Sequence, residues 1–502
     1  MESQRKYGAM LSYLNIIIKN LINFIYTPLL LRLAGQNEYG LFQMTNSVAM
    51  SLSLLSMGFS SAYVKFYMTY KVNKDIENIK KLNGLYLILF SAISVIALTI
   101  GLILVVNTTQ IFGRNLDKSE LILTKQLMLI LVINVFLTFP SSVFDANIMV
   151  HQRFIFQQTR QILQTILVPI ISISIIFMGA NVLAVGITQM FVTLLFLILN
   201  VNYCLKQLNM QFDFRKLPIG LFKRLLSFSA FILLNQIVDM VNNNGPNFIL
   251  GIVRGAKDVA IFAIAIQIKN MFFMLSTSLS TVFIPRVNEL VSKNDDAKSL
   301  TSLMIKVGRL QMAILFFILG GFIILGDYFV YIWAGSENTE AYFLVIFMVL
   351  PSVIPLSQNI GIEIQRAMNK HIFRSIVYTL FAIINIIVTI IGTEFCGLVG
   401  ATFGYVISIL VANGLVMNWY YHTKMSLDMK FFWRNTIKVI IPFITATSIL
   451  LLAQIYFPVN NYFKFVIFGI VYTFIYGLIY LLFIANSLEK QQLASIFNKK
   501  IK

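Results

Sequence analysis

Charged residues are scarce in this sequence. Asp, Glu, Lys and Arg make up 12% of its 502 residues, whereas soluble domains carry roughly 25%. Hydrophobic residues make up 58%, and the mean hydropathy is +0.81. Apolar runs of about 18 to 25 residues recur along the whole chain, and a helix needs about 20 residues to span a bilayer. The composition therefore excludes a soluble globular protein and predicts an all-α polytopic membrane protein.

Cysteine and histidine are also rare, with two and three residues. Cys204 and Cys396 are expected near opposite membrane faces, which argues against a disulfide framework or a thiolate metal site. His151, His371 and His422 fall in or beside loops and lack the spacing of a zinc motif. We therefore expect no metal and no cofactor.

Signatures of catalysis are missing as well. The stretch from Gly113 to Ser119 is the nearest approach to a Walker A motif, but it lacks the second glycine. The predicted loops are too short to hold a soluble catalytic or nucleotide-binding domain. No nucleophile, general acid/base pair or metal constellation is visible. We expect that the protein is not an enzyme.

Fourteen membrane spans are predicted from apolar runs bounded by charged and turn residues. The spans are expected at residues 10–33, 41–64, 82–106, 121–140, 162–178, 182–203, 225–250, 258–284, 307–326, 341–363, 375–391, 397–418, 437–457 and 464–484.

The formal charge of +19 is distributed unevenly over the predicted loops. Of the 39 Lys and Arg residues, roughly 30 fall in one set of alternate loops, Arg160 among them, and about 7 in the other, as the positive-inside rule expects. Both termini are therefore predicted to be cytoplasmic. This asymmetry accounts for most of the charge without nucleic acid, for which the basic loops carry no binding motif.

An internal repeat is visible when the chain is shifted by 220 positions. Leu14-Asn15 then falls on Leu234-Asn235, Lys19 on Asp239, Asn23 on Asn243 and Gly35 on Gly255. A second echo, shifted by about 217 positions, pairs the segment from Gln152 with the segment from Asn369. Six spans separate the halves, so both keep one orientation, as in transporters with parallel repeats. We predict an N-terminal lobe at 1–210 (spans 1–6), a C-terminal lobe at 211–425 (spans 7–12) and a last part at 426–502 with spans 13 and 14.

Polar residues within the predicted spans mark a candidate site. A charge near the bilayer centre costs at least roughly 2.5–3.5 kcal/mol, so such residues usually face a cavity or a partner. One face of the first span carries Asn15, Lys19 and Asn23, and one face of the seventh carries Asn235, Asp239 and Asn243; Lys269 lies deep in the eighth. These stripes predict a polar cavity between the lobes. The alternative is an interhelical ion pair, with the Asn side chains stabilising helix packing.

Three further charged residues lie near the ends of predicted spans. Glu363 and Arg366 end the tenth span, and a gating role and an interfacial charge pair fit them equally well. Asp145, at the end of the fourth span, is interpreted as a solvated helix end.

Four segments near the N-terminus resemble a known family. They run from Arg5 to Leu14, Tyr26 to Arg32, Gly35 to Phe42 and Leu55 to Phe59. They are similar to the opening of the bacterial lipid-linked oligosaccharide flippases. That family is the polysaccharide-transporter (Wzx-like) branch of the multidrug/oligosaccharidyl-lipid/polysaccharide exporter superfamily. The span count and the two-lobe repeat extend the resemblance to the whole chain.

The resemblance implies a flippase in the bacterial plasma membrane. It would move an undecaprenyl-diphosphate-linked oligosaccharide to the outer leaflet by alternating access, for O-antigen, lipopolysaccharide, capsule or similar biosynthesis, with glycan polymerases as partners and H⁺ or Na⁺ coupling. Lys19 and Lys269 would then hold the diphosphate, and Asp239 would be the coupling residue. The residues expected to hydrogen-bond sugar hydroxyls are Asn15, Asn23, Asn235 and Asn243.

Two other functions compete with this interpretation. A drug/cation antiporter of the same superfamily would be expected to use an acidic cluster, and Asp239 alone supplies little negative charge beside the deep lysines. A membrane-embedded glycan polymerase would be expected to display sizeable outer loops, whereas the predicted outer loops are short.

Overall fold

The computed structural model describes most of the chain, and all regular structure in the described part is helical. The described residues are 2–56, 59–215, 236–238, 240–293, 297–487 and 489–490. The chain forms two compact units. Unit 1 comprises Met1–Ala263 and Thr393–Leu398, and unit 2 comprises Ile264–Gly392 and Val399–Lys502.

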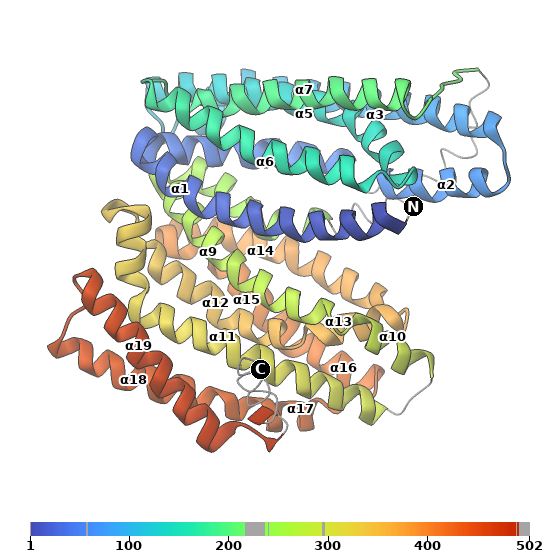
Figure 1. Ribbon diagram of the computed structural model, residues 1–502. Helices are drawn as coiled ribbons and strands as arrows, with labels where there is room; N and C mark the ends of the chain where they lie inside the picture. The colour runs from blue at the N-terminus through green and yellow to red at the C-terminus, as the bar shows by residue number, and fades with distance from the viewer. Residues whose placement is uncertain are drawn as a thin grey trace. The chain divides into compact units, whose positions relative to one another are not determined.

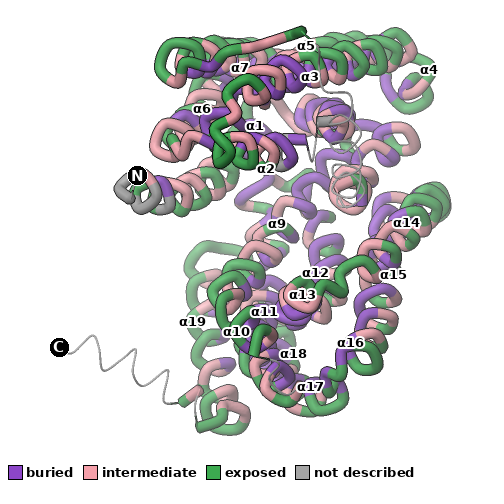
Figure 2. The backbone as a smooth tube through the Cα atoms, turned by 90° about the vertical axis from the view of Figure 1, so that its right-hand side faces the viewer, coloured by how far each residue is buried: buried purple, intermediate pink, exposed green. Residues whose placement is uncertain are grey.

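Unit 1 is a bundle of long helices. Within it α3 packs against α5, α5 against α7, and α1 against α6 (Figure 1). Figure 2 shows buried residues between the helices of this unit and exposed residues along its outward faces. The named helices of unit 1 are α1 (Glu2–Ser53), α2 (Phe59–Val72), α3 (Ile76–Val106), α4 (Thr108–Phe112), α5 (Lys118–Val150), α6 (Phe154–Phe177) and α7 (Leu183–Lys206).

Local sequence explains where these helices begin and break. α5 begins at a capping box, in which the Asp117 side chain accepts from the Glu120 N–H and the Glu120 carboxylate accepts from the Asp117 N–H. α1 is interrupted at Gly35, whose φ of 85° and ψ of 165° are not helical. Glycine adopts a positive φ at low cost because it has no Cβ. The interruption falls between the first and second predicted spans.

Unit 2 packs around α11 (Ala297–Ala334), which contacts α12, α17, α18 and α19. Its core at one end includes Val287, Met304, Ile364 and Phe432. The other named elements of unit 2 are α9 (Ala256–Thr281, most of it in this unit), α10 (Ile284–Ser292), α12 (Ala341–Ser357), α13 (Asn359–Ala367), α14 (His371–Gly400), α15 (Phe403–Ser408), the π-helical η3 (Ile409–Met417), α16 (Asn418–Lys424), α17 (Met429–Thr436), α18 (Ile440–Tyr456) and α19 (Tyr462–Ile479).

The described helices fit a multi-pass membrane protein. Eleven of them are long and apolar enough to cross a membrane, or twelve if the pair α12 and α13, bent by 42°, counts as one span. α1 covers both the first and the second predicted span, on either side of Gly35. Much of the seventh predicted span lies outside the described residues. The polytopic helical fold is confirmed, but the count of fourteen spans stays a prediction.

The backbone repeats where the sequence does. Gly35 and Gly255, paired by the 220-residue shift, have φ of 85° and 94°. Gln152 and Asn369, paired by the second echo, both have φ of 55°. The residue after each of Gln152 and Asn369 donates its backbone N–H to the carbonyl five residues earlier. Arg153 donates to Ile148 at 3.2 Å, and Lys370 donates to Gln365 at 2.9 Å. Two related helix–turn–helix segments therefore share the same turn geometry.

The segment after α7 lies against α3 within unit 1. The Asp213 N–H donates to the Lys80 carbonyl at 3.0 Å, and the Asn83 side chain donates to the Gln211 carbonyl at 2.8 Å. A Cβ on Gly84 would lie 2.4 Å from the Asp213 carbonyl oxygen, so only glycine fits there. These contacts hold the segment 211–213 on the end of α3.

Arg309, on α11, fixes the C-terminal end of unit 2. Its guanidinium donates to both carboxylate oxygens of Glu489, at 2.7 and 2.9 Å. It also donates to the backbone carbonyls of Asn435 at 2.6 Å and Ile484 at 2.8 Å. The Arg309 side chain is 9% exposed. Four acceptors therefore surround one buried cation.

Candidate functional site

The polar stripe of the first span lies along an edge of unit 1. Lys19 and Asn23 are exposed, whereas Asn15 is half-buried. The Asn15 amide donates to Gln158 Oε1 at 3.3 Å and to Gln161 Oε1 at 3.1 Å, both on α6. α1 thus carries an ammonium and an amide on its exposed face, next to an amide cluster shared with α6.

α1 and α6 run parallel in a constant register. Asn15 meets Gln161 and Tyr26 meets Ser172, and each pair is separated by 146 positions. The Tyr26 and Ser172 hydroxyls are 3.1 Å apart. The same offset places Lys19 level with Thr165, one turn beyond Gln161. The two helices therefore present their polar residues at matching heights.

Lys269, the other deep lysine, is buried in unit 2. Lys269 is 1% exposed. Its Nζ lies 4.4 Å from the centroid of the Tyr405 ring and 5.7 Å from the centroid of the Phe273 ring. The Tyr405 hydroxyl lies 2.8 Å from Ser352 Oγ. An aromatic face attracts a cation electrostatically, more strongly when both are desolvated, so these rings stabilise the ammonium where it lies.

The remaining predicted residues of the second stripe are only partly described. Asn243 is half-buried in a helical segment of unit 1. Asn235 and Asp239 lie outside the described residues. Their expected roles stay predictions.

Glu363 and Arg366 contact each other on α13. Arg366 Nη1 lies 2.7 Å from Glu363 Oε1, and the Arg366 side chain is 65% exposed. The pair lies beyond the bend between α12 and α13. An exposed pair of this kind is typically worth about 0–1 kcal/mol, so it contributes little to the stability of unit 2.

A buried ion pair in unit 1 was missed by the sequence interpretation. Arg160 Nη2 lies 2.8 Å from Asp145 Oδ1, and the Asn200 amide donates to the same oxygen at 3.0 Å. The sequence predicts Arg160 in a basic loop and Asp145 at a solvated helix end. Both predictions are wrong. Arg160 lies inside α6 with its side chain 9% exposed, and Asp145 lies inside α5, where its side chain is 30% exposed and paired with Arg160. The polar run Gln157 to Gln164 was the available signal.

A buried amide cluster in unit 2 was also missed. Gln311 on α11 donates to Ser280 Oγ at 2.7 Å and to Ser276 Oγ at 3.1 Å, and Asn359 donates to Ser276 Oγ at 2.9 Å. Gln311 Oε1 is buried without a hydrogen-bond partner in the described part of the chain. The cluster adjoins the α12–α13 bend, since Ser276 Oγ donates to the Leu356 carbonyl.

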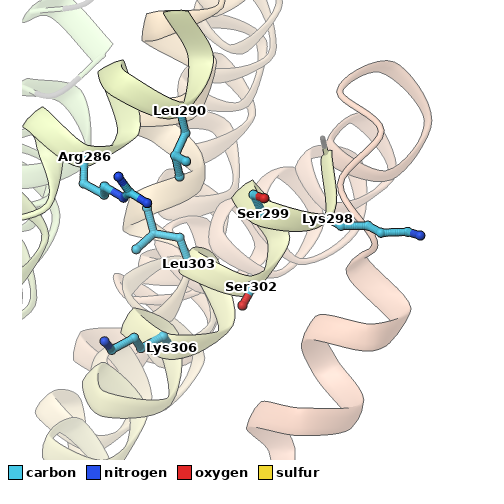
Figure 3. Close-up of a pocket in the computed structure, with 7 residues that line it drawn as sticks. All are labelled: Arg286, Leu290, Lys298, Ser299, Ser302, Leu303 and Lys306. Atoms are coloured by element: carbon cyan, nitrogen blue, oxygen red, sulfur yellow. The ribbon is translucent and has the colours of Figure 1, made fainter. Parts of the chain in front are cut away.

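A cavity of about 460 Å³ opens between α10 and the start of α11. Its lining includes Arg286, Lys298 and Lys306, and Figure 3 shows the Lys298 side chain pointing away from the others. Arg286 is paired with Glu289 at 2.7 Å. Hydrogen bonds from Lys293 and Arg286 lower the pKa of Glu289 to about 2. This cavity is therefore partly neutralised and is a weaker anion site than its lysines indicate.

A metal site has no support in the parts of the chain that the structure describes. They contain no group of three His, Cys, Asp or Glu residues arranged to hold a metal ion.

A second cavity, of about 520 Å³ and lined by Glu38, Asp117 and Glu120 among others, lies at the start of α5. Its carboxylates are engaged, Glu38 by the Val182 N–H and the other two in the α5 capping box.

The chain matches known proteins in sequence and in fold. The family model described as polysaccharide biosynthesis protein matches residues 7–291. An uncharacterized membrane protein, EpsK of Bacillus subtilis (strain 168), is 21% identical over 483 residues, covering 94% of each chain.

Solved structures share the fold at low sequence identity. The lipid II flippase MurJ, in an inward closed conformation, is 14% identical with a TM-score of 0.71, covering 94% of this chain and 97% of that one. An inward-facing multidrug resistance MATE family transporter of the MOP superfamily is 14% identical with a TM-score of 0.65, covering 82% and 95%.

Proposed function

Because the chain belongs to the polysaccharide biosynthesis protein family of the multidrug/oligosaccharidyl-lipid/polysaccharide exporter superfamily, we propose that it flips a lipid-linked oligosaccharide. The substrate is an undecaprenyl-diphosphate-linked glycan, moved across the bacterial plasma membrane by alternating access for cell-surface polysaccharide biosynthesis such as O-antigen or capsule. Both termini are cytoplasmic in this proposal, and glycan polymerases act on the product.

One observation carries the proposal beyond the family. The exposed ammonium of Lys19 lies on α1 between the exposed amide of Asn23 and the half-buried amide of Asn15, which contacts α6. A lysine binds phosphate as a compact point charge, and amides donate to and accept from hydroxyls. A diphosphate joined to a sugar presents both chemistries side by side, whereas a hydrophobic drug cation would be repelled by the lysine.

The two lysines have different roles in this proposal. Lys19 contacts the diphosphate directly. Lys269 would have to leave the Tyr405 ring to reach an anion, so it either moves during the cycle or adds positive potential from the core of unit 2. Asn23, Asn235 and Asn243 hydrogen-bond sugar hydroxyls, Asp239 couples transport to H⁺ or Na⁺, and Glu363 with Arg366 gates the pathway.

The test begins with lipid extracts of cells with and without the protein. We expect a polyprenyl-diphosphate oligosaccharide to accumulate without it, and mass spectrometry to give the mass of its repeat unit. Complementation with Lys19→Ala should fail, whereas Lys19→Arg should retain part of the activity because the cation remains. Unchanged lipid-linked sugars together with raised sensitivity to cationic drugs would instead indicate an antiporter.

A further inference from the structure

The amide cluster formed by Asn15, Gln158 and Gln161 has hydrogen-bonding capacity left over. Asn15 Nδ2 donates to both glutamine oxygens, and neither glutamine Nε2 group donates back to Asn15. Asn15 Oδ1 is buried and has no hydrogen-bond partner among the described residues. A buried acceptor without a partner is unfavourable, because it has lost its hydrogen bonds to water. A ligand hydroxyl that donates a hydrogen bond would give this acceptor a partner.

Helix packing alone does not require three amides here. Interhelical hydrogen bonds in membranes contribute little on average, and van der Waals contacts also hold membrane helices together. Gln158, Gln161 and Gln164 recur every third position of α6, and all three are half-buried. Residues three apart share one helix face. α6 therefore presents a row of amides alongside the exposed edge of α1.

The position of the cluster identifies what it meets. Lys19 follows Asn15 by one turn of α1, a rise of about 6 Å, and lies level with Thr165 of α6. In the proposed function Lys19 holds the diphosphate. The diphosphate carries the polyprenyl chain on one side and the first sugar of the glycan on the other. Of these two groups, only the sugar can form hydrogen bonds with the neutral amides that lie one helix turn from Lys19.

We propose that Asn15, Gln158 and Gln161 bind the sugar bonded to the diphosphate. Sugar hydroxyls both donate and accept hydrogen bonds, so one hydroxyl donates to Asn15 Oδ1 while others accept from the glutamine Nε2 groups. The inference rests on the proposed flippase function and adds the glutamines of α6 to the site. It makes the first sugar, rather than the distal glycan, the part that this cluster recognises.

The test compares binding of two lipids to the purified protein in nanodiscs. The probes are undecaprenyl diphosphate and undecaprenyl diphosphate carrying the single first sugar of the glycan that accumulates in cells lacking the protein. The double variant Gln158→Leu with Gln161→Leu keeps side-chain size. It should bind the sugar-bearing lipid at least tenfold more weakly and the bare diphosphate lipid unchanged. Lys19→Ala should weaken both.

Gln189→Leu is the matched control, because Gln189 is a half-buried amide on another helix of unit 1; it should bind both lipids normally. Equal binding of the sugar-bearing lipid by the double variant and the unaltered protein would overturn the inference. So would an equal loss for both lipids in a variant whose thermal unfolding is unchanged. If the double variant does not fold, Gln158→Asn and Gln161→Asn singly provide the same comparison. Absence of any accumulating lipid-linked glycan would instead overturn the proposed function.

Discussion

The guanidinium of Arg160 and the carboxylate of Asp145 form an ion pair of 2.8 Å inside unit 1. The two residues lie on different helices, α6 and α5, and Asn200 of α7 donates to the same carboxylate oxygen. One polar contact therefore joins three helices of the bundle.

Removing one partner of this pair should destabilise the protein strongly. Asp145→Leu leaves a buried guanidinium without its counter-ion, which typically costs about 3–5 kcal/mol. The double variant Asp145→Leu with Arg160→Met should recover most of that loss, because two apolar residues leave no unpaired charge. Thermal unfolding of Asp145→Leu, Arg160→Met and the double variant measures the loss and its recovery. A double variant as unstable as the Asp145 single would show that the pair is not the source of the effect.

The contact between Arg309 and Glu489 should hold the C-terminal end of unit 2. Glu489→Ala is expected to lower stability by about 3 kcal/mol, since it leaves a buried cation with two carbonyls only. Glu289→Ala removes a carboxylate that pairs with two exposed cations, Arg286 and Lys293, and should leave the unfolding temperature nearly unchanged. The opposite ranking of the two variants would contradict this prediction.

The same contact should depend on pH. Burial raises the pKa of Glu489, but hydrogen bonds from Arg309 and from the Asn486 backbone outweigh that effect, and the pKa is lowered overall. A carboxylate with a lowered folded-state pKa stabilises the fold above its ordinary value of about 4.3. This contribution is lost as the pH falls through the folded-state pKa. The stability difference between the unaltered protein and Glu489→Gln should therefore shrink below pH 4.

His151 should make unit 1 less stable in mild acid. Burial lowers its pKa; Nδ1 donates to the Asn147 carbonyl at 2.9 Å, and the Tyr67 hydroxyl lies 3.3 Å from Nε2. The unfolded chain takes up the proton first, near pH 6.5, so this contribution is complete above that pH and declines as the pH falls below it. His151→Gln should flatten the unfolding temperature between pH 7 and 5. An identical pH profile for both proteins would refute this.

Gly84 should be indispensable for the packing of the segment after α7. Gly84→Ala places a Cβ 2.4 Å from the Asp213 carbonyl oxygen, and overpacking typically costs about 1–3 kcal/mol. Trypsin should then cleave faster at Lys206 and Arg215. Gly245→Ala is the control, because nothing lies within 4 Å of its added Cβ and alanine favours a helix. Equal cleavage of both variants would show that the contact does not hold the segment.

The family assignment and the helical fold followed from local patterns. Apolar runs alone require helices, because a bilayer leaves no other partner for backbone polar groups of an open chain. The repeat could be detected from the sequence because a turn that needs a positive φ selects a few residue types. The paired positions 35 and 255 both carry glycine, and both have a positive φ.

The partners of the polar residues were decided by tertiary structure. The sequence placed Asn15, Lys19 and Asn23 on one helix, but their spacing drifts around the helix axis, so Asn15 turns to α6 while Lys19 and Asn23 stay exposed. The sequence predicts Arg160 as a loop cation. In the structure, α5 and α7 place Asp145 and Asn200 beside one another next to it. Helical periodicity fixes which face a side chain occupies, whereas the identity of its neighbour depends on how distant helices pack, and apolar spans give little sequence information about that packing.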